Sequence, residues 1–141
     1  MTVNEFRRRM YELVQLYPRL ARGGLNSAQL RDLVRCVARR RGWDARVTYR
    51  PWPWPGTTQL IGDSIEIVVD SRRNPAEQVM ALAHEVGHVC LGHLHEDVFW
   101  TELDGPYSRE QDEWADLFAS IVLNRRIGPL DYLGREQLEI F

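Results

Sequence analysis

Residues 74–92, NPAEQVMALAHEVGHVCLG, decide the fold of this chain. Asn74 can cap a helix that has Pro75 at its first position, and Gly92 marks the end of that helix. Apolar residues recur along one face of the helix, at Val79, Leu82, Ala83, Val86, Val89 and Cys90. The opposite face carries His84, Glu85 and His88. The stretch therefore predicts a helix with one side in the core and one side available for chemistry.

The central part of this helix, HEVGH at residues 84–88, is an instance of the HExxH pattern. Residues four apart lie one turn above each other, so His84 and His88 can reach one metal ion. Glu85 is displaced by about 100° around the helix and is expected beside the ion. There it can take a proton from a water that a Zn²⁺-type ion polarises. The pattern predicts a hydrolase with one Zn²⁺ and Glu85 as its catalytic residue.

Two histidines do not complete such a site, because a catalytic zinc normally has three protein ligands and one open position. A second helix is predicted downstream, over residues 108–124, where Ser108 and Gln111 form a capping box. This helix carries four acidic candidates for the third ligand: Glu110, Asp112, Glu113 and Asp116. Asp116 is also a candidate for orienting a ligand histidine, or for simple solvation of the helix.

The rest of the chain predicts an α+β fold. Residues 1–42 read as two amphipathic helices, with a break at Pro18 and a cap at Asn26 or Ser27. Three strand-like segments follow, at residues 45–49, 59–61 and 64–70, with a hairpin turn at residues 62–63. We expect a small antiparallel sheet of about three strands packed on the helices.

The length of 141 residues is enough for one hydrophobic core, so we expect a single domain over residues 1–141. Its parts would be N-terminal helices at 1–42, a strand and catalytic core at 43–124, and a C-terminal tail at 125–141.

Charge, cysteine content and apolar runs indicate which partners and which compartment to expect. The net charge of −2 combines a basic part up to Arg50 with an acidic remainder. The arginines are spread along helix-like segments among apolar residues, which favours a solvated face and no direct nucleic-acid binding. Cys36 and Cys90 stand in apolar stretches without a short spacing, which is typical of free thiols in a reducing compartment. No signal segment follows Met1 and no apolar run approaches about 18 residues, so we predict a cytoplasmic protein without a membrane segment.

The residues from Ile65 to Leu91, a strand, a short turn and then AHEVGH, resemble the ImmA/IrrE-type metallopeptidases. Residues 115–120, ADLFAS, are similar to the Glu-x-x-Ala-(Asn/Asp)-x-Phe-Ala helix of that family. The resemblance covers roughly Leu30 to Leu123. It implies a zinc metallopeptidase that cuts a protein substrate. In related proteins this is often a helix-turn-helix repressor, cut to release genes of a mobile element or a stress response. This chain shows no DNA-binding module of its own, so the repressor would be a separate partner.

The family register also bears on the third ligand. A ligand Glu stands three residues before the helix alanine in that family, and this chain has Asp112 there. The aspartate is one methylene shorter, so its helix must approach more closely. Glu113 has the customary length but is rotated by about 100°, and both residues stay candidates. The resemblance further implies that the strand at 64–70 is the edge against which an extended substrate pairs.

An alternative hypothesis is a metal-binding regulatory or interaction module that acts on a partner protein without cutting it, and the short side chain of Asp112 keeps this alternative open. A third is a nucleic-acid-associated protein that uses the arginine-rich part.

Some other residues have both a functional and a structural interpretation. His93 and His95 can add a ligand or a proton, or can cap a helix end. Trp52 and Trp54 can grip a substrate or pack over the sheet, and Tyr107 can stabilise an oxyanion.

Overall fold

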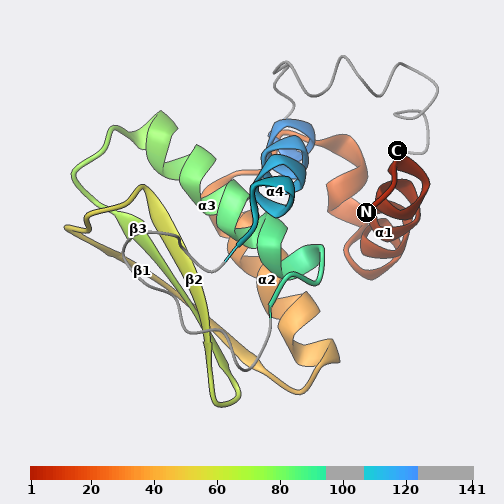
Figure 1. The fold of residues 1–141 in the computed structure, drawn as a ribbon, viewed down its shortest axis with the longest axis horizontal. Helices are drawn as coiled ribbons and strands as arrows, with labels where there is room; N and C mark the ends of the chain where they lie inside the picture. The colour runs from red at the N-terminus through yellow and green to blue at the C-terminus, as the bar shows by residue number, and fades with distance from the viewer. Residues whose placement is uncertain (95–106, 124–141) are drawn as a thin grey trace.

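The computed structural model describes residues 1–94 and 107–123 (Figure 1). In chain order its elements are α1 (Val3–Leu16), η1 (Pro18–Arg22), α2 (Ser27–Arg40), β1 (Asp44–Arg50), β2 (Gly56–Ile61), β3 (Ser64–Asp70), α3 (Pro75–Cys90) and α4 (Arg109–Val122). A mixed architecture of four α-helices and one three-stranded sheet in these ranges agrees with the predicted α+β class. The expected tail at 125–141 and His95 lie outside the described residues.

The helices begin where local sequence provides caps. Capping boxes start α1, α2 and α4, formed by Thr2 with Glu5, Asn26 with Gln29, and Ser108 with Gln111. At α3 the side chain of Asn74 accepts the backbone N–H of Glu77 at 2.8 Å, and Pro75 takes the first helical position. These interactions join residues three apart, so the sequence alone fixes where each helix starts. No helix in the described part of the chain is long and apolar enough to cross a membrane.

The sheet is mixed, and the predicted antiparallel sheet is wrong in this respect. β3 pairs antiparallel with β2 but parallel with β1, in the order β1-β3-β2. The reason is the proline-rich segment 51–55, which cannot form a tight hairpin between β1 and β2. It crosses the end of β3 instead, where Pro55 C=O accepts the N–H of Asp70 and Arg50 C=O accepts the N–H of Ser71. β3 is thereby inserted between the two strands that precede it.

The central place of β3 corrects a second expectation. Residues 64–70 were expected to form the edge that meets a substrate, but both sides of β3 are paired. Its helix-facing side chains are completely buried: Ile65, Ile67 and Val69. A nearly continuous apolar run is typical of such an interior strand. Within residues 1–94 and 107–123, the strands that pair on one side only are β1 and β2.

The core lies between the sheet and the helices, with α3 at its centre. α3 runs between the sheet and α4 and also packs on α2 (Figure 1). Leu82, Ala83 and Val86 of α3 are fully buried in the hydrophobic cluster.

At Gly87 the helices α3 and α4 approach very closely. A Cβ placed there would lie 2.9 Å from Phe118 Cδ1 and 3.2 Å from the carbonyl oxygen of Ala115. The missing side chain therefore lets α4 lie against the turn of α3 that carries the two histidines.

Candidate metal centre

Three side chains of α3 form a group that could hold a metal ion. His84, Glu85 and His88 each offer one ligand atom, and these atoms lie within 4.8 Å of one another. The Nε2 atoms of the two histidines are 3.1 Å apart, with their rings nearly perpendicular at 82°. The helical spacing of four residues produces this convergence, as the sequence predicted.

α4 brings Asp112 to the same point. Its Oδ1 atom lies 3.3 Å from His84 Nε2 and 3.0 Å from His88 Nε2. The three atoms form a triangle whose edges are 3.0–3.3 Å long. Donors bound to a tetrahedral Zn²⁺ at about 2.0–2.1 Å lie roughly 3.3 Å from one another. The size of the triangle and its two nitrogens and one oxygen therefore fit a zinc ion.

Glu113, the other candidate, points elsewhere. Its Oε1 atom lies 3.3 Å from Nε of Arg109, one helical turn earlier, and 64% of its side chain is exposed. Rotation by one residue around α4 takes the Glu113 side chain away from α3. The structure brings Asp112, and not Glu113, to the two histidines.

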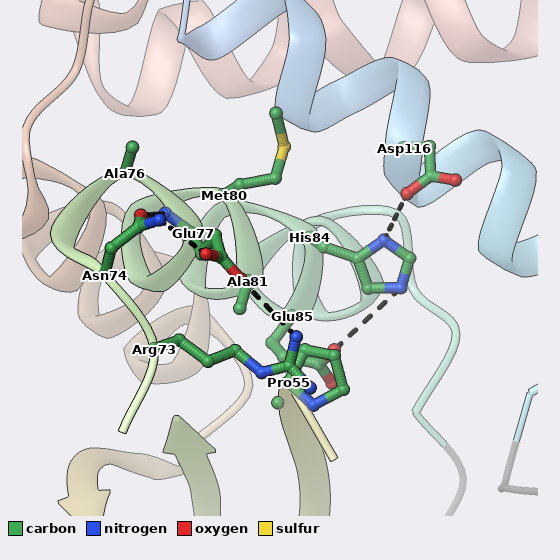
Figure 2. A pocket seen from close by; sticks show the side chains of 11 residues that line it. Pro55, Arg73, Asn74, Ala76, Glu77, Met80, Ala81, His84, Glu85 and Asp116 are labelled. Atoms are coloured by element: carbon green, nitrogen blue, oxygen red, sulfur yellow. Dashed lines mark hydrogen bonds and ion pairs between the residues drawn. The ribbon is translucent and has the colours of Figure 1, made fainter. Parts of the chain in front are cut away.

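Asp116 lies behind His84. Its Oδ1 atom is 2.7 Å from Nδ1 of His84, one turn of α4 beyond Asp112 (Figure 2). A carboxylate at this distance keeps a proton on Nδ1, so Nε2, which faces Asp112 and His88, is the ring nitrogen that could bind a metal ion. The sequence left open whether Asp116 orients a histidine, and its position favours that role.

The convergence of these groups changes their protonation. Burial alone would lower the pKa of His84, but hydrogen bonds with Asp112 and Asp116 raise it to about 10. Burial alone would raise the pKa of Asp112, but hydrogen bonds with His84 and His88 hold it well below its usual range. The two Nε2 atoms and Asp112 Oδ1 can approach one another only with a cation between them. A proton on these atoms therefore competes with a metal ion.

Glu85 lies at the side of the triangle. Its side chain is 7% exposed, and its Oε2 atom is 3.9 Å from His84 Nε2. Its Oε1 atom accepts a hydrogen bond from the buried hydroxyl of Thr58, on β2, at 2.7 Å. Burial raises the pKa of Glu85. A carboxylate whose pKa is raised by burial accepts a proton more readily, as a general base must.

The contact from Thr58 was not foreseen from the sequence. Thr58 occupies a helix-facing position of β2, opposite Ile67, and is only 1% exposed. The predicted strand began at residue 59, whereas β2 begins at Gly56, so the core-facing position of Thr58 was outside the prediction. A buried hydroxyl at such a position requires a partner.

His93 and Tyr107 contact the ring of His88. Nδ1 of His93 lies 2.9 Å from Nδ1 of His88, on the side of the ring away from the triangle. The ring of Tyr107 stacks on His88 at 3.6 Å, and its hydroxyl donates to Thr58 C=O at 3.3 Å. These contacts place both residues where they can orient His88.

Trp52 packs over the sheet. Its indole N–H donates to the hydroxyl of Thr57 at 3.1 Å. The ring of Trp54 lies edge-on to the ring of Trp52, with 5.9 Å between the ring centroids. Thr57 is on the opposite face of β2 from Thr58, so Trp52 covers the face of the sheet that points away from α3. Of the two interpretations of Trp52, this position favours packing.

In comparisons with known proteins, no family model matches this chain, and no curated protein or solved structure matches it. The resemblance to the ImmA/IrrE-type metallopeptidases therefore stays a prediction from sequence motifs.

Proposed function

We propose that this chain is a zinc-dependent metallopeptidase with one ion, held by His84, His88 and Asp112. The observation that carries the proposal is the triangle of Nε2, Nε2 and Oδ1 atoms with edges of 3.0–3.3 Å. Two imidazoles and one carboxylate are a ligand set of catalytic zinc, and they leave a fourth position open.

Glu85 is the proposed general base. Zn²⁺ at this site would polarise a water molecule and the carbonyl of the substrate. Thr58 holds Oε1 of Glu85, so Oε2 on the side of His84 takes the proton from the attacking water. Glu85 then gives that proton to the amine that leaves. Its raised pKa suits both transfers.

The edge of β2 supports a peptide as the substrate. Asp70 N–H donates to Pro55 C=O, which identifies these two residues as a hydrogen-bonded pair of the β2-β3 ladder. Hydrogen-bonded and non-hydrogen-bonded pairs alternate along the strand. The N–H and C=O groups of Gly56, Thr58 and Leu60 therefore point away from β3, along the plane of the sheet. The hydroxyl of Tyr107 donates to Thr58 C=O, which agrees with this direction and directs a peptide to the groups of Gly56 and Leu60. An extended peptide can pair along this edge beside Glu85.

The substrate is proposed to be a protein. The motif resemblance favours a DNA-binding repressor as the substrate. Co-incubation of the zinc-loaded protein with a helix-turn-helix repressor, followed by mass spectrometry, would give two defined fragments. An intact repressor beside cleavage of unrelated unfolded proteins would contradict this choice of substrate.

The decisive test replaces Glu85 by Gln. The variant keeps its zinc, because the three ligands are intact, but peptide hydrolysis falls by at least about 100-fold, as expected when a general base is lost. Glu12→Gln, at an exposed position of α1, is the matched control and keeps full activity. If Glu85→Gln binds the partner protein and retains full biological activity, the chain is instead the non-proteolytic interaction module.

A further inference from the structure

A pocket of about 550 Å³ opens beside Glu85 and His84. Its α3 wall is formed by three pairs of residues spaced four apart, 76–77, 80–81 and 84–85, which share one face of the helix. Pro55 and Gly56, at the start of β2, form part of the facing wall. Figure 2 shows that this face continues from His84 and Glu85 towards the beginning of α3. The pocket is therefore continuous with the proposed reacting centre.

The charged groups in the pocket wall lie close to groups of opposite charge. Nη1 of Arg73 lies 3.6 Å from Oε2 of Glu77, and its Nε lies 3.4 Å from Oδ2 of Asp70 without a hydrogen bond in the described residues. The amide of Asn74 also donates to Glu77, and Asp116 contacts His84. A charged side chain that entered would lose its hydration and would compete with these ion pairs, and an acidic one would also meet the carboxylates of Glu77, Glu85 and Asp116.

Apolar surface remains for a guest side chain. Pro55, Met80 and Ala81 present it next to Glu85. Burial of an aliphatic or aromatic side chain against such surface is favourable in proportion to the area removed from water.

Two small residues keep the pocket open. A Cβ at Gly56 would lie 3.0 Å from Cγ of Glu85 and 3.6 Å from Cβ of Ala81. Larger side chains at either position would occupy the space where β2 passes Glu85. Met80, one residue before Ala81, is the largest apolar side chain in the wall.

We propose that this pocket is the specificity subsite of the peptidase and receives a large, uncharged apolar side chain of the residue next to the scissile bond. Leucine, methionine and phenylalanine are the side chains that it fits, and Met80 and Ala81 limit their size. The inference rests on the proposed function. A peptide paired along β2 directs alternate side chains to one side, so one residue near Glu85 enters the pocket.

The test measures binding of N-acetyl amino-acid hydroxamates to the zinc-loaded protein by calorimetry. These compounds share one metal-binding group and differ only in the side chain, and acetohydroxamate has none. The leucine derivative binds roughly 10- to 100-fold more tightly than the glycine derivative, as expected for burial of one leucine side chain. The glutamate derivative binds no more tightly than the glycine derivative.

Two variants locate this preference in the pocket. Ala81→Leu fills it and brings the ratio of leucine to glycine affinities close to one, whereas the same change at the exposed Ala28 of α2 leaves the ratio unchanged. Met80→Ala widens the pocket and increases the preference for phenylalanine over leucine. This second variant serves as the test if Ala81→Leu does not fold.

The outcomes separate the two proposals. If acetohydroxamate does not bind the zinc-loaded protein, the metal centre itself is contradicted. If acetohydroxamate binds but the leucine and glycine derivatives bind equally, only the subsite is overturned. Tighter binding of the glutamate derivative would likewise overturn the apolar character of the subsite.

Discussion

Gly87 and Ala115 touch across the interface of α3 and α4. A Cβ at position 87 would lie 3.2 Å from the carbonyl oxygen and 3.3 Å from Cα of Ala115. Asp112 stands one turn before Ala115, so this contact fixes how far its side chain must reach. The close approach explains how an aspartate can meet His84 and His88, although its side chain is one methylene shorter than a glutamate.

Gly87→Ala tests this relationship. The added methyl group forces α4 away from α3, so zinc affinity falls at least about tenfold and the unfolding free energy falls by roughly 1–3 kcal/mol, as is common for overpacking. Zinc titration against a chelator and denaturant unfolding measure the two effects. The double variant Gly87→Ala with Asp112→Glu regains zinc, because the longer side chain spans the wider gap. Unchanged zinc affinity in Gly87→Ala would contradict the steric argument.

The two candidate ligands differ in their predicted loss of zinc. Asp112→Ala weakens zinc binding by more than the roughly 10- to 100-fold expected for an outer-shell partner, because a proposed ligand itself is lost. Glu113→Ala removes only the exposed contact with Arg109 and leaves the zinc content unchanged. Elemental analysis of the purified variants measures the difference. Equal retention of zinc in both would sink the proposed ligand set.

Asp116→Asn changes the partner of His84 and keeps its size. The amide no longer favours the proton on Nδ1, so zinc affinity falls by about 10- to 100-fold. Glu110 is another acidic residue of α4, and Glu110→Gln is the matched control. This control retains the zinc affinity of the wild type. Competition with a fluorescent chelator gives both constants, and identical constants would show that Asp116 has only a solvating role.

The carboxylate of Asp70 should make stability depend on acid pH. The hydrogen bond with Arg72 lowers the pKa of Asp70 to about 2, against the opposing effect of burial. The folded-state pKa lies below the unfolded value, so this stabilisation is complete above about pH 4 and is lost as pH falls through about 2. Asp70→Asn therefore lowers the melting temperature clearly at pH 5 and much less at pH 2.

Thermal unfolding of wild type and Asp70→Asn at both pH values checks this expectation. Asp63→Asn, in the exposed turn between β2 and β3, is the control and should show no such convergence. A constant gap between wild type and Asp70→Asn at the two pH values would contradict the argument.

The parts of the fold that the sequence predicted correctly are those set by neighbours in the chain. The cap at Asn74, the convergence of His84 with His88, and the turn at Gly62 each depend on residues within a few positions. The order of the strands in the sheet depends instead on residues far apart in the chain. Parallel pairing of β1 with β3 joins residues twenty positions apart, such as Asp44 and Ser64, and the strand patterns carry no signal of that partner.

In the candidate site, too, the residues set by neighbours in the chain were predicted and the contacts between distant segments were not. The motif predicted the α3 residues because helical geometry alone brings them together. The choice between Asp112 and Glu113 needed the separation of two helices, and that separation depends on the contact at Gly87. Thr58 was missed because its importance arises only where β2 lies against Glu85.

The insertion of β3 between β1 and β2 has a consequence for the order of folding. β2 and β3 are joined by a two-residue turn and can pair within microseconds, whereas β1 must wait until their hairpin presents a free edge. Thr58 belongs to that early hairpin, whereas Asp112 arrives with α4, late in the chain. We therefore expect nascent chains to assemble the support for Glu85 first and to gain metal affinity only when α4 docks.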